Sequence, residues 1–90
     1  MINKNIQKVV KWIKNPESVS NEELRGMYLE TKDHNPNSDL EYNIAFVCET
    51  AYASVLCALK GDKEGKDDCR SFAYCGVKNY SNLTGEVIEL

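Results

Sequence analysis

The sequence has little histidine, proline or tryptophan, with one, two and one of these among its 90 residues. A zinc site usually takes four thiolate or imidazole ligands, commonly in pairs two to four residues apart. The cysteines, Cys48, Cys57, Cys69 and Cys75, are instead 9, 12 and 6 residues apart, and His34 lies in a polar stretch. We therefore expect no metal site and no cofactor, and we expect the cysteines to be buried small hydrophobic residues.

Catalytic motifs are absent as well. A cysteine nucleophile needs a base within hydrogen-bond reach and a group that orients this base, and nothing in the sequence marks such a set. The acidic pairs Glu22-Glu23 and Asp67-Asp68 lie near predicted helix starts, where the helix dipole favours negative charge. The five glycines match neither a P-loop nor a dinucleotide-binding fingerprint. The sequence predicts no catalytic residue and a protein that is not an enzyme.

Long apolar runs are missing too. The first 14 residues contain no apolar run of seven, which argues against a signal peptide, and no stretch approaches 18 uninterrupted apolar residues. We therefore expect a cytoplasmic protein without a membrane partner, in the host cell if a phage encodes it. In that compartment the cysteines are expected to be reduced.

Acidic residues outnumber basic residues outside the first segment. Residues 1–14 carry four lysines and no acid, so that the net charge of −3 leaves −7 on residues 15–90. Non-specific binding to nucleic acid is electrostatic and needs a broad basic surface. The sequence therefore makes nucleic acid an improbable partner, although the first helix keeps it open as an alternative.

What the sequence does contain is helical periodicity. Over residues 2–14 the apolar residues recur at spacings of three and four, with the lysines largely opposite them, which predicts an amphipathic helix that ends before Pro16. Ser20 and Glu23 have the spacing of a capping box, so we predict a second helix over residues 21–33.

The third segment is the most apolar part of the chain. Ser38 and Glu41 form another capping-box pattern, which opens a helix predicted over residues 39–60 that is apolar around most of its circumference, with a thin polar strip of Glu49, Thr50 and Lys60. A fourth amphipathic helix is predicted over residues 66–81, and residues 82–90 form a tail that fits a helical turn or a short strand. The sequence predicts one all-α domain over residues 1–90, a compact four-helix bundle around the third helix.

The first helix supplies the candidate contact residues. Trp12 lies at the border of its apolar face, where a tryptophan serves either as core packing or as an anchor at a protein interface. Beside Trp12 lies a strip of lysines. These lysines are either simply solvated, or they surround a Trp12 anchor with positive charge that suits an acidic partner. The strip consists of Lys4, Lys8, Lys11 and Lys14.

Several short stretches carry a resemblance to a known group. These are Ala51-Tyr52-Ala53, Ala73-Tyr74, Val77-Lys78-Asn79-Tyr80 and Leu83-Thr84-Gly85-Glu86. Over residues 44–86 the chain resembles small uncharacterised alanine- and tyrosine-rich helical accessory proteins of tailed phages and prophages. It differs from them in having fewer alanines, more cysteines and a basic first helix. The resemblance implies a phage accessory protein that binds and blocks a host protein, and it assigns no site residue.

These observations favour binding without chemistry. We expect a small intracellular protein-binding module that occupies a surface of a host or other cellular protein, as a phage inhibitor of a defence or transcription protein would (an anti-CRISPR-like or other anti-host role). One alternative is a nucleic-acid-binding regulator that uses the first helix. The other is a structural homo-oligomer, such as a homodimer, joined through Phe46, Ala53 and Cys57.

Overall fold

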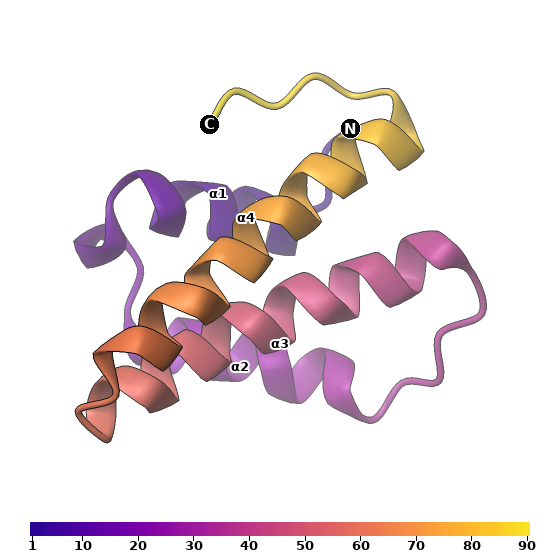
Figure 1. The fold of residues 1–90 in the computed structure, drawn as a ribbon. Helices are drawn as coiled ribbons and strands as arrows, with labels where there is room; N and C mark the ends of the chain where they lie inside the picture. The colour runs from indigo at the N-terminus through magenta and orange to yellow at the C-terminus, as the bar shows by residue number, and fades with distance from the viewer.

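The computed structural model describes residues 1–90 as four α-helices and one short 3-10 helix, with no strand. The elements in chain order are α1 (Lys4–Lys14), η1 (Pro16–Ser18), α2 (Asn21–Lys32), α3 (Asp39–Leu59) and α4 (Lys63–Thr84). Figure 1 shows α3 and α4 as the two long helices, joined by a tight corner, with α1 behind α4 and α2 beside α3. The prediction of an all-α bundle is confirmed.

Side-chain caps fix where the first three helices begin. Asn3 accepts hydrogen bonds from two backbone N–H groups of the first turn of α1. Ser20 and Glu23 form the complete predicted capping box, with bonds of 3.1 and 3.0 Å. Ser38 caps α3 at 3.2 Å, but the Glu41 carboxylate accepts from Asn37 N, so only half of the second predicted box forms.

The fourth helix is longer than predicted at both ends. It begins at Lys63 because the Asp62 carboxylate accepts from Gly65 N at 2.9 Å, which satisfies an N–H group of the first turn. It ends at Thr84 because Gly85 takes the left-handed conformation, with φ of 74°, and its N–H bonds to Ser81 O. The predicted limits of 66 and 81 were therefore wrong by three residues on each side.

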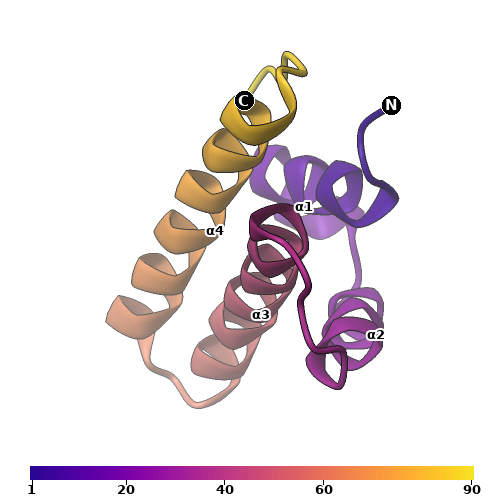
Figure 2. The same cartoon turned by 90° about the vertical axis from the view of Figure 1, so that its right-hand side faces the viewer.

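Helix α3 is the centre of the bundle, as predicted. It packs against α1, α2 and α4, and Figure 2 shows it between α4 and α2, with α1 passing behind it. All four helices contribute to a single core. Its buried apolar members are Ile6, Val9, Trp12, Ile13, Val19, Leu24, Met27, Val47, Cys48, Ala51, Val55, Ala73, Val77 and Tyr80.

The side of α3 that meets α4 is polar in part, which the apolar pattern did not predict. Asn43 donates from Nδ2 to Gly76 O at 3.0 Å, and the Ser54 hydroxyl donates to Lys66 O at 2.8 Å. Thr50, which was predicted to lie on the exposed polar strip, is buried, whereas Leu59 is 71% exposed. Short side chains that bond to a neighbouring backbone let two helices approach closely. Which residues of α3 are buried therefore depends on this contact with α4 more than on the apolar periodicity of α3.

The tail after α4 is neither a helical turn nor a strand. Residues 85–90 have no regular structure and run back over the bundle, as Figure 1 shows. The Ser81 hydroxyl donates to Glu86 O, and the amino terminus lies 2.6 Å from the Glu86 carboxylate. Ile88 packs against the core. These contacts hold the tail without a backbone ladder.

By length and composition, α3 is apolar enough to cross a membrane. A third of its most apolar 18-residue window is buried inside the bundle. Its apolarity matches its central position, because a helix with neighbours on several sides needs apolar residues around most of its circumference.

Gly76 and Gly26 provide a matched test of the α3–α4 contact. A Cβ on Gly76 would lie 2.6 Å from Val47 Cγ2, whereas a Cβ on Gly26 would meet nothing within 4 Å. We expect Gly76→Ala to lower the free energy of unfolding by about 1 to 2 kcal/mol, because overpacking exceeds the gain in helix propensity. Gly26→Ala should raise it by about 0.5 to 1 kcal/mol. Urea unfolding measures both, and a Gly76→Ala protein as stable as the parent would contradict the close approach.

Candidate protein-binding surface

Trp12 does not lie on the surface. Its side chain is 6% exposed and belongs to the core, next to Ile13 in the sequence. The backbone of the neighbouring Ile13 accepts a hydrogen bond from Arg70, so this end of α1 is held against α4. Of the two interpretations of Trp12, burial supports packing, and we no longer assign it a contact with a partner.

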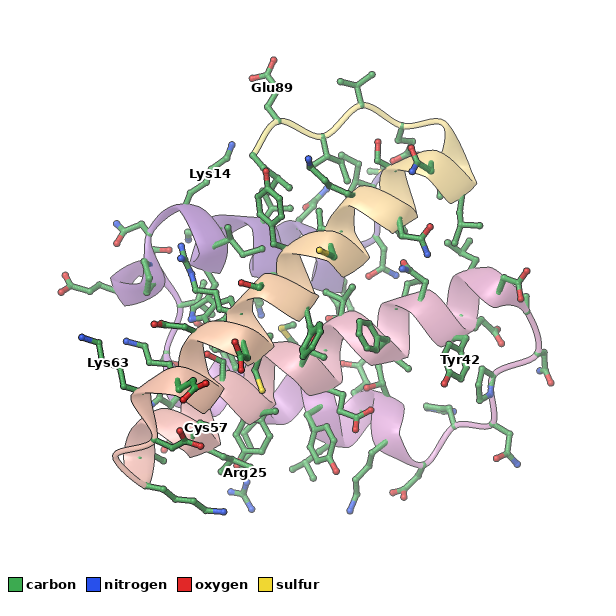
Figure 3. The ribbon with its side chains drawn as sticks, in the orientation of Figure 1. Lys14, Arg25, Tyr42, Cys57, Lys63 and Glu89 are labelled. Atoms are coloured by element: carbon green, nitrogen blue, oxygen red, sulfur yellow. The ribbon has the colours of Figure 1, made fainter.

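The four lysines of α1 are all exposed. Lys4 lies 3.7 Å from the Glu30 carboxylate of α2, in an ion pair open to solvent that contributes little to stability. Figure 3 shows the side chain of Lys14 extending away from the bundle. The structure thus keeps the lysine strip (Lys4, Lys8, Lys11 and Lys14) as a charged surface but removes the aromatic anchor predicted beside it.

A different aromatic surface lies on α3. Tyr42 is 66% exposed, Phe46 and Ala53 are half-buried, and Leu56 is exposed. Spacings of four, seven and three residues place them along one line of the helix. We call these four residues the α3 ridge. It faces solvent because α1, α2 and α4 occupy the other sides of α3.

Helix α4 extends this surface. Phe72 is 54% exposed and Leu83 is also exposed. They lie four residues before and seven after Gly76, and so on the same face of α4. A Cβ on Gly76 would come within 3.4 Å of the Phe46 ring. This face therefore borders the α3 ridge.

A hollow of about 370 Å³ separates the α3 ridge from α4; its lining is Asp39, Tyr42, Asn43, Phe46, Asn79 and Leu83. The Oδ1 atom of Asn43 is buried and has no hydrogen-bond partner, because only the Nδ2 of this amide bonds to α4. No basic residue lines this α3–α4 hollow, and Asp39 adds a carboxylate to it. The hollow therefore combines the Asp39 carboxylate with the aromatic side chains of Tyr42 and Phe46.

A second hollow lies on the other flank of the α3 ridge, between α2 and α3. It also reaches Tyr42 and Phe46, and Tyr28 of α2 forms part of its wall. The Tyr28 ring stacks on Tyr52 of α3, with the ring centroids 5.3 Å apart. Stacked rings of this kind stabilise a packed pair, so this wall is held in place. The ridge thus stands between two depressions on rigid helices.

The cysteines differ from the uniform burial predicted for them. Cys48 is buried, Cys57 and Cys69 are half-buried, and Cys75 is exposed, which corrects the prediction for Cys75. Burial raises the pKa of the Cys48 thiol to about 11, against a hydrogen bond from Thr31 that acts in the opposite direction. No three histidine, cysteine or acidic side chains are grouped where they could hold a metal ion.

The three residues predicted to join two copies of the chain are all half-buried. Phe46 and Ala53 belong to the α3 ridge, whereas Cys57 lies near the corner between α3 and α4. The fold covers this side of α3 only in part. Sequence reasoning missed Tyr42 and Leu83 as surface residues. It also placed Phe72 on the apolar face of the fourth helix, whereas the structure leaves this ring exposed.

The chain was compared with known proteins, and no family model, curated protein or solved structure matches it.

Cys48 makes stability depend on pH. The unfolded thiol loses its proton near pH 9, whereas the folded thiol keeps it to about pH 11, so unfolding releases a proton between these values. The contribution of Cys48 to the free energy of unfolding is therefore fully present below pH 9. It falls by about 2 to 3 kcal/mol as the pH rises to 11. Urea unfolding at a series of pH values should show a weaker decline for Cys48→Ala, and equal slopes for the two proteins would exclude this origin.

Proposed function

We propose that this protein acts by binding another protein through the α3 ridge, together with Phe72 and Leu83 of α4. The observation that supports this is the exposure of Tyr42 and Phe72, two large aromatic side chains on the packed helices α3 and α4, and Tyr42 also lines the α3–α4 hollow. Aromatic residues next to a pocket are the usual anchors of protein interfaces. Most of the chain's other aromatic rings are at least half-buried, which leaves these two as its main exposed aromatic surface.

The chemistry of the α3–α4 hollow indicates what the partner carries. The Asp39 carboxylate accepts hydrogen bonds, and the rings of Tyr42 and Phe46 that line the same hollow can attract a cation. An arginine or lysine side chain fits this combination, because its stem packs on the rings while its charged end donates to the acceptors. We propose that the partner inserts a basic side chain here and lays apolar residues over the ridge.

The resemblance to phage accessory proteins supports a host protein as this partner. A domain with 90 residues that binds without chemistry acts by covering a surface that its partner needs. In this proposal it is an inhibitor of a host defence or transcription protein.

The lysine strip supports a second candidate function, the binding of nucleic acid. All four lysines are exposed, and α1 has no acidic residue. Contacts between lysines and phosphates release counterions, so this binding would weaken steeply with added salt.

Paired substitutions test the proposed surface. We expect the double variant Tyr42→Ala, Phe72→Ala to weaken partner binding by at least about 100-fold, since each anchor contributes about 2 kcal/mol or more. The control is Leu59→Ala, Val87→Ala, which removes two equally exposed apolar side chains outside this surface. Affinity capture from the native host, followed by titration of the captured protein, measures the effect. Equal affinity for the two variants, with unchanged thermal melts, would remove the ridge from the interface.

The nucleic-acid alternative has its own measurement. If it holds, the parent protein should shift labelled duplex or single-stranded probes at 50 mM salt and release them by 200 mM, and replacement of all four lysines by glutamine should abolish the shift. The double variant at Tyr42 and Phe72 should shift the probes like the parent. No shift at low salt for the parent would dispose of this alternative.

A further inference from the structure

Two cysteines meet at the corner between α3 and α4, away from the α3–α4 hollow. Cys57 is in the last turn of α3, and Cys69 is in the second turn of α4. Both are half-buried, so small reagents can reach them while the fold limits their motion. Figure 3 labels Cys57 where the end of α3 passes the first turns of α4.

The corner between the helices is fixed by backbone hydrogen bonds. Asp62 N donates to Cys57 O at 2.9 Å, and the Asp62 carboxylate accepts from Gly65 N at 2.9 Å. Gly61 turns the chain with φ of 76°, which glycine adopts without strain. Cys57 is therefore tied by its own carbonyl to the residue that starts α4.

Gly65 lets the Cys57 thiol lie against α4. A Cβ at position 65 would be 3.0 Å from Cys57 Sγ, so the absence of a side chain there leaves space for the sulfur. Cys69 follows Gly65 by four residues and thus lies one turn further on the same face. Cys57 is among the groups that raise the pKa of the Cys69 thiol, which agrees with the two sulfurs lying on the same side of the corner.

We propose that Cys57 and Cys69 are a redox modification site, which low-molecular-weight disulfides such as glutathione disulfide convert into an intramolecular disulfide bond. One protein thiolate attacks the glutathione disulfide, forms a mixed disulfide and releases one glutathione thiolate. The second protein thiolate then attacks the protein sulfur of the mixed disulfide and releases the other. Two electrons pass to glutathione, and the two thiol protons end on the two glutathione molecules.

The surroundings set the rate of this exchange. Burial raises the pKa of Cys69 above its usual value, and Cys57, Asp68 and Asp62 raise it further. The thiolate is the attacking species, so the exchange is slow at neutral pH and accelerates as the pH rises. The fixed corner favours closure once a mixed disulfide has formed, because the second thiol is already beside it.

The bond would close a loop of 13 residues, from Cys57 to Cys69. Closing such a loop removes conformational freedom from the unfolded chain, so the oxidised protein should melt about 10 to 20 °C above the reduced protein. Cys48 stays outside the reaction because it is fully buried in the core. Cys75 is exposed on α4, so it can form a mixed disulfide with glutathione but takes no part in the Cys57–Cys69 bond.

The experiment incubates the fully reduced chain with glutathione disulfide at pH 8.5 and follows its mass and free thiols. The expected product is a monomer that has lost two hydrogen atoms at Cys57 and Cys69, carries at most one glutathione, on Cys75, and regains all four thiols with dithiothreitol. After denaturation and tryptic digestion, peptide 33–60 should be joined to peptide 67–70. Formation should be faster at pH 9 than at pH 7.

Single variants assign the bond. Cys57→Ser and Cys69→Ser should each stop at a glutathione adduct or remain reduced, and Cys75→Ser, the matched control on α4, should form the bond like the parent. A parent protein that keeps four thiols, holds glutathione without closing the loop, or forms a bond through Cys48, Cys75 or a second molecule would overturn the proposal. The measurements on the parent decide the matter even if a serine variant fails to fold.

Discussion

The fold depends on the close approach of α3 and α4 at Gly76. The backbone of α4 comes so near to Val47 that no side chain fits at position 76. Asn43 donates a hydrogen bond to the carbonyl of Gly76, and Ser54 donates one to the carbonyl of Lys66, near the other end of the contact. These hydrogen bonds satisfy polar groups that burial would otherwise leave without partners. The two longest helices therefore form a rigid pair, against which the shorter helices α1 and α2 pack.

This arrangement also determines which surface remains open. A chain of 90 residues has only three helices with which to cover a central fourth one, so one side of α3 faces solvent. The residues on that side are aromatic and apolar, and the close approach at Gly76 places the α4 face with Phe72 and Leu83 beside them. The free oxygen of Asn43 follows from the same contact, because its amide nitrogen is bonded to α4.

The ends of the α3–α4 pair differ in chemistry. One end combines rings with acceptors and suits a basic side chain, and the other holds two thiols in a tight corner. The lysine strip lies on α1, which is behind α4 in Figure 1. Positive charge, aromatic surface and thiols are thus separated over a small molecule, so that each can be changed by substitution without removing the others.

The sequence by itself determined the number and order of the helices, the Ser20 capping box and the central place of the third helix. Local hydrogen bonds and apolar periodicity specify these features within single segments. Only the tertiary structure decided that Trp12 is buried, that Thr50 turns inward and that Tyr42 stays exposed. The angle and distance at which another helix crosses decide whether a border residue is covered, and this contact involves residues far apart in the chain. The proposed bond between Cys57 and Cys69 also depends on tertiary structure. The corner that brings the two residues together is formed by Gly61, Asp62 and Gly65.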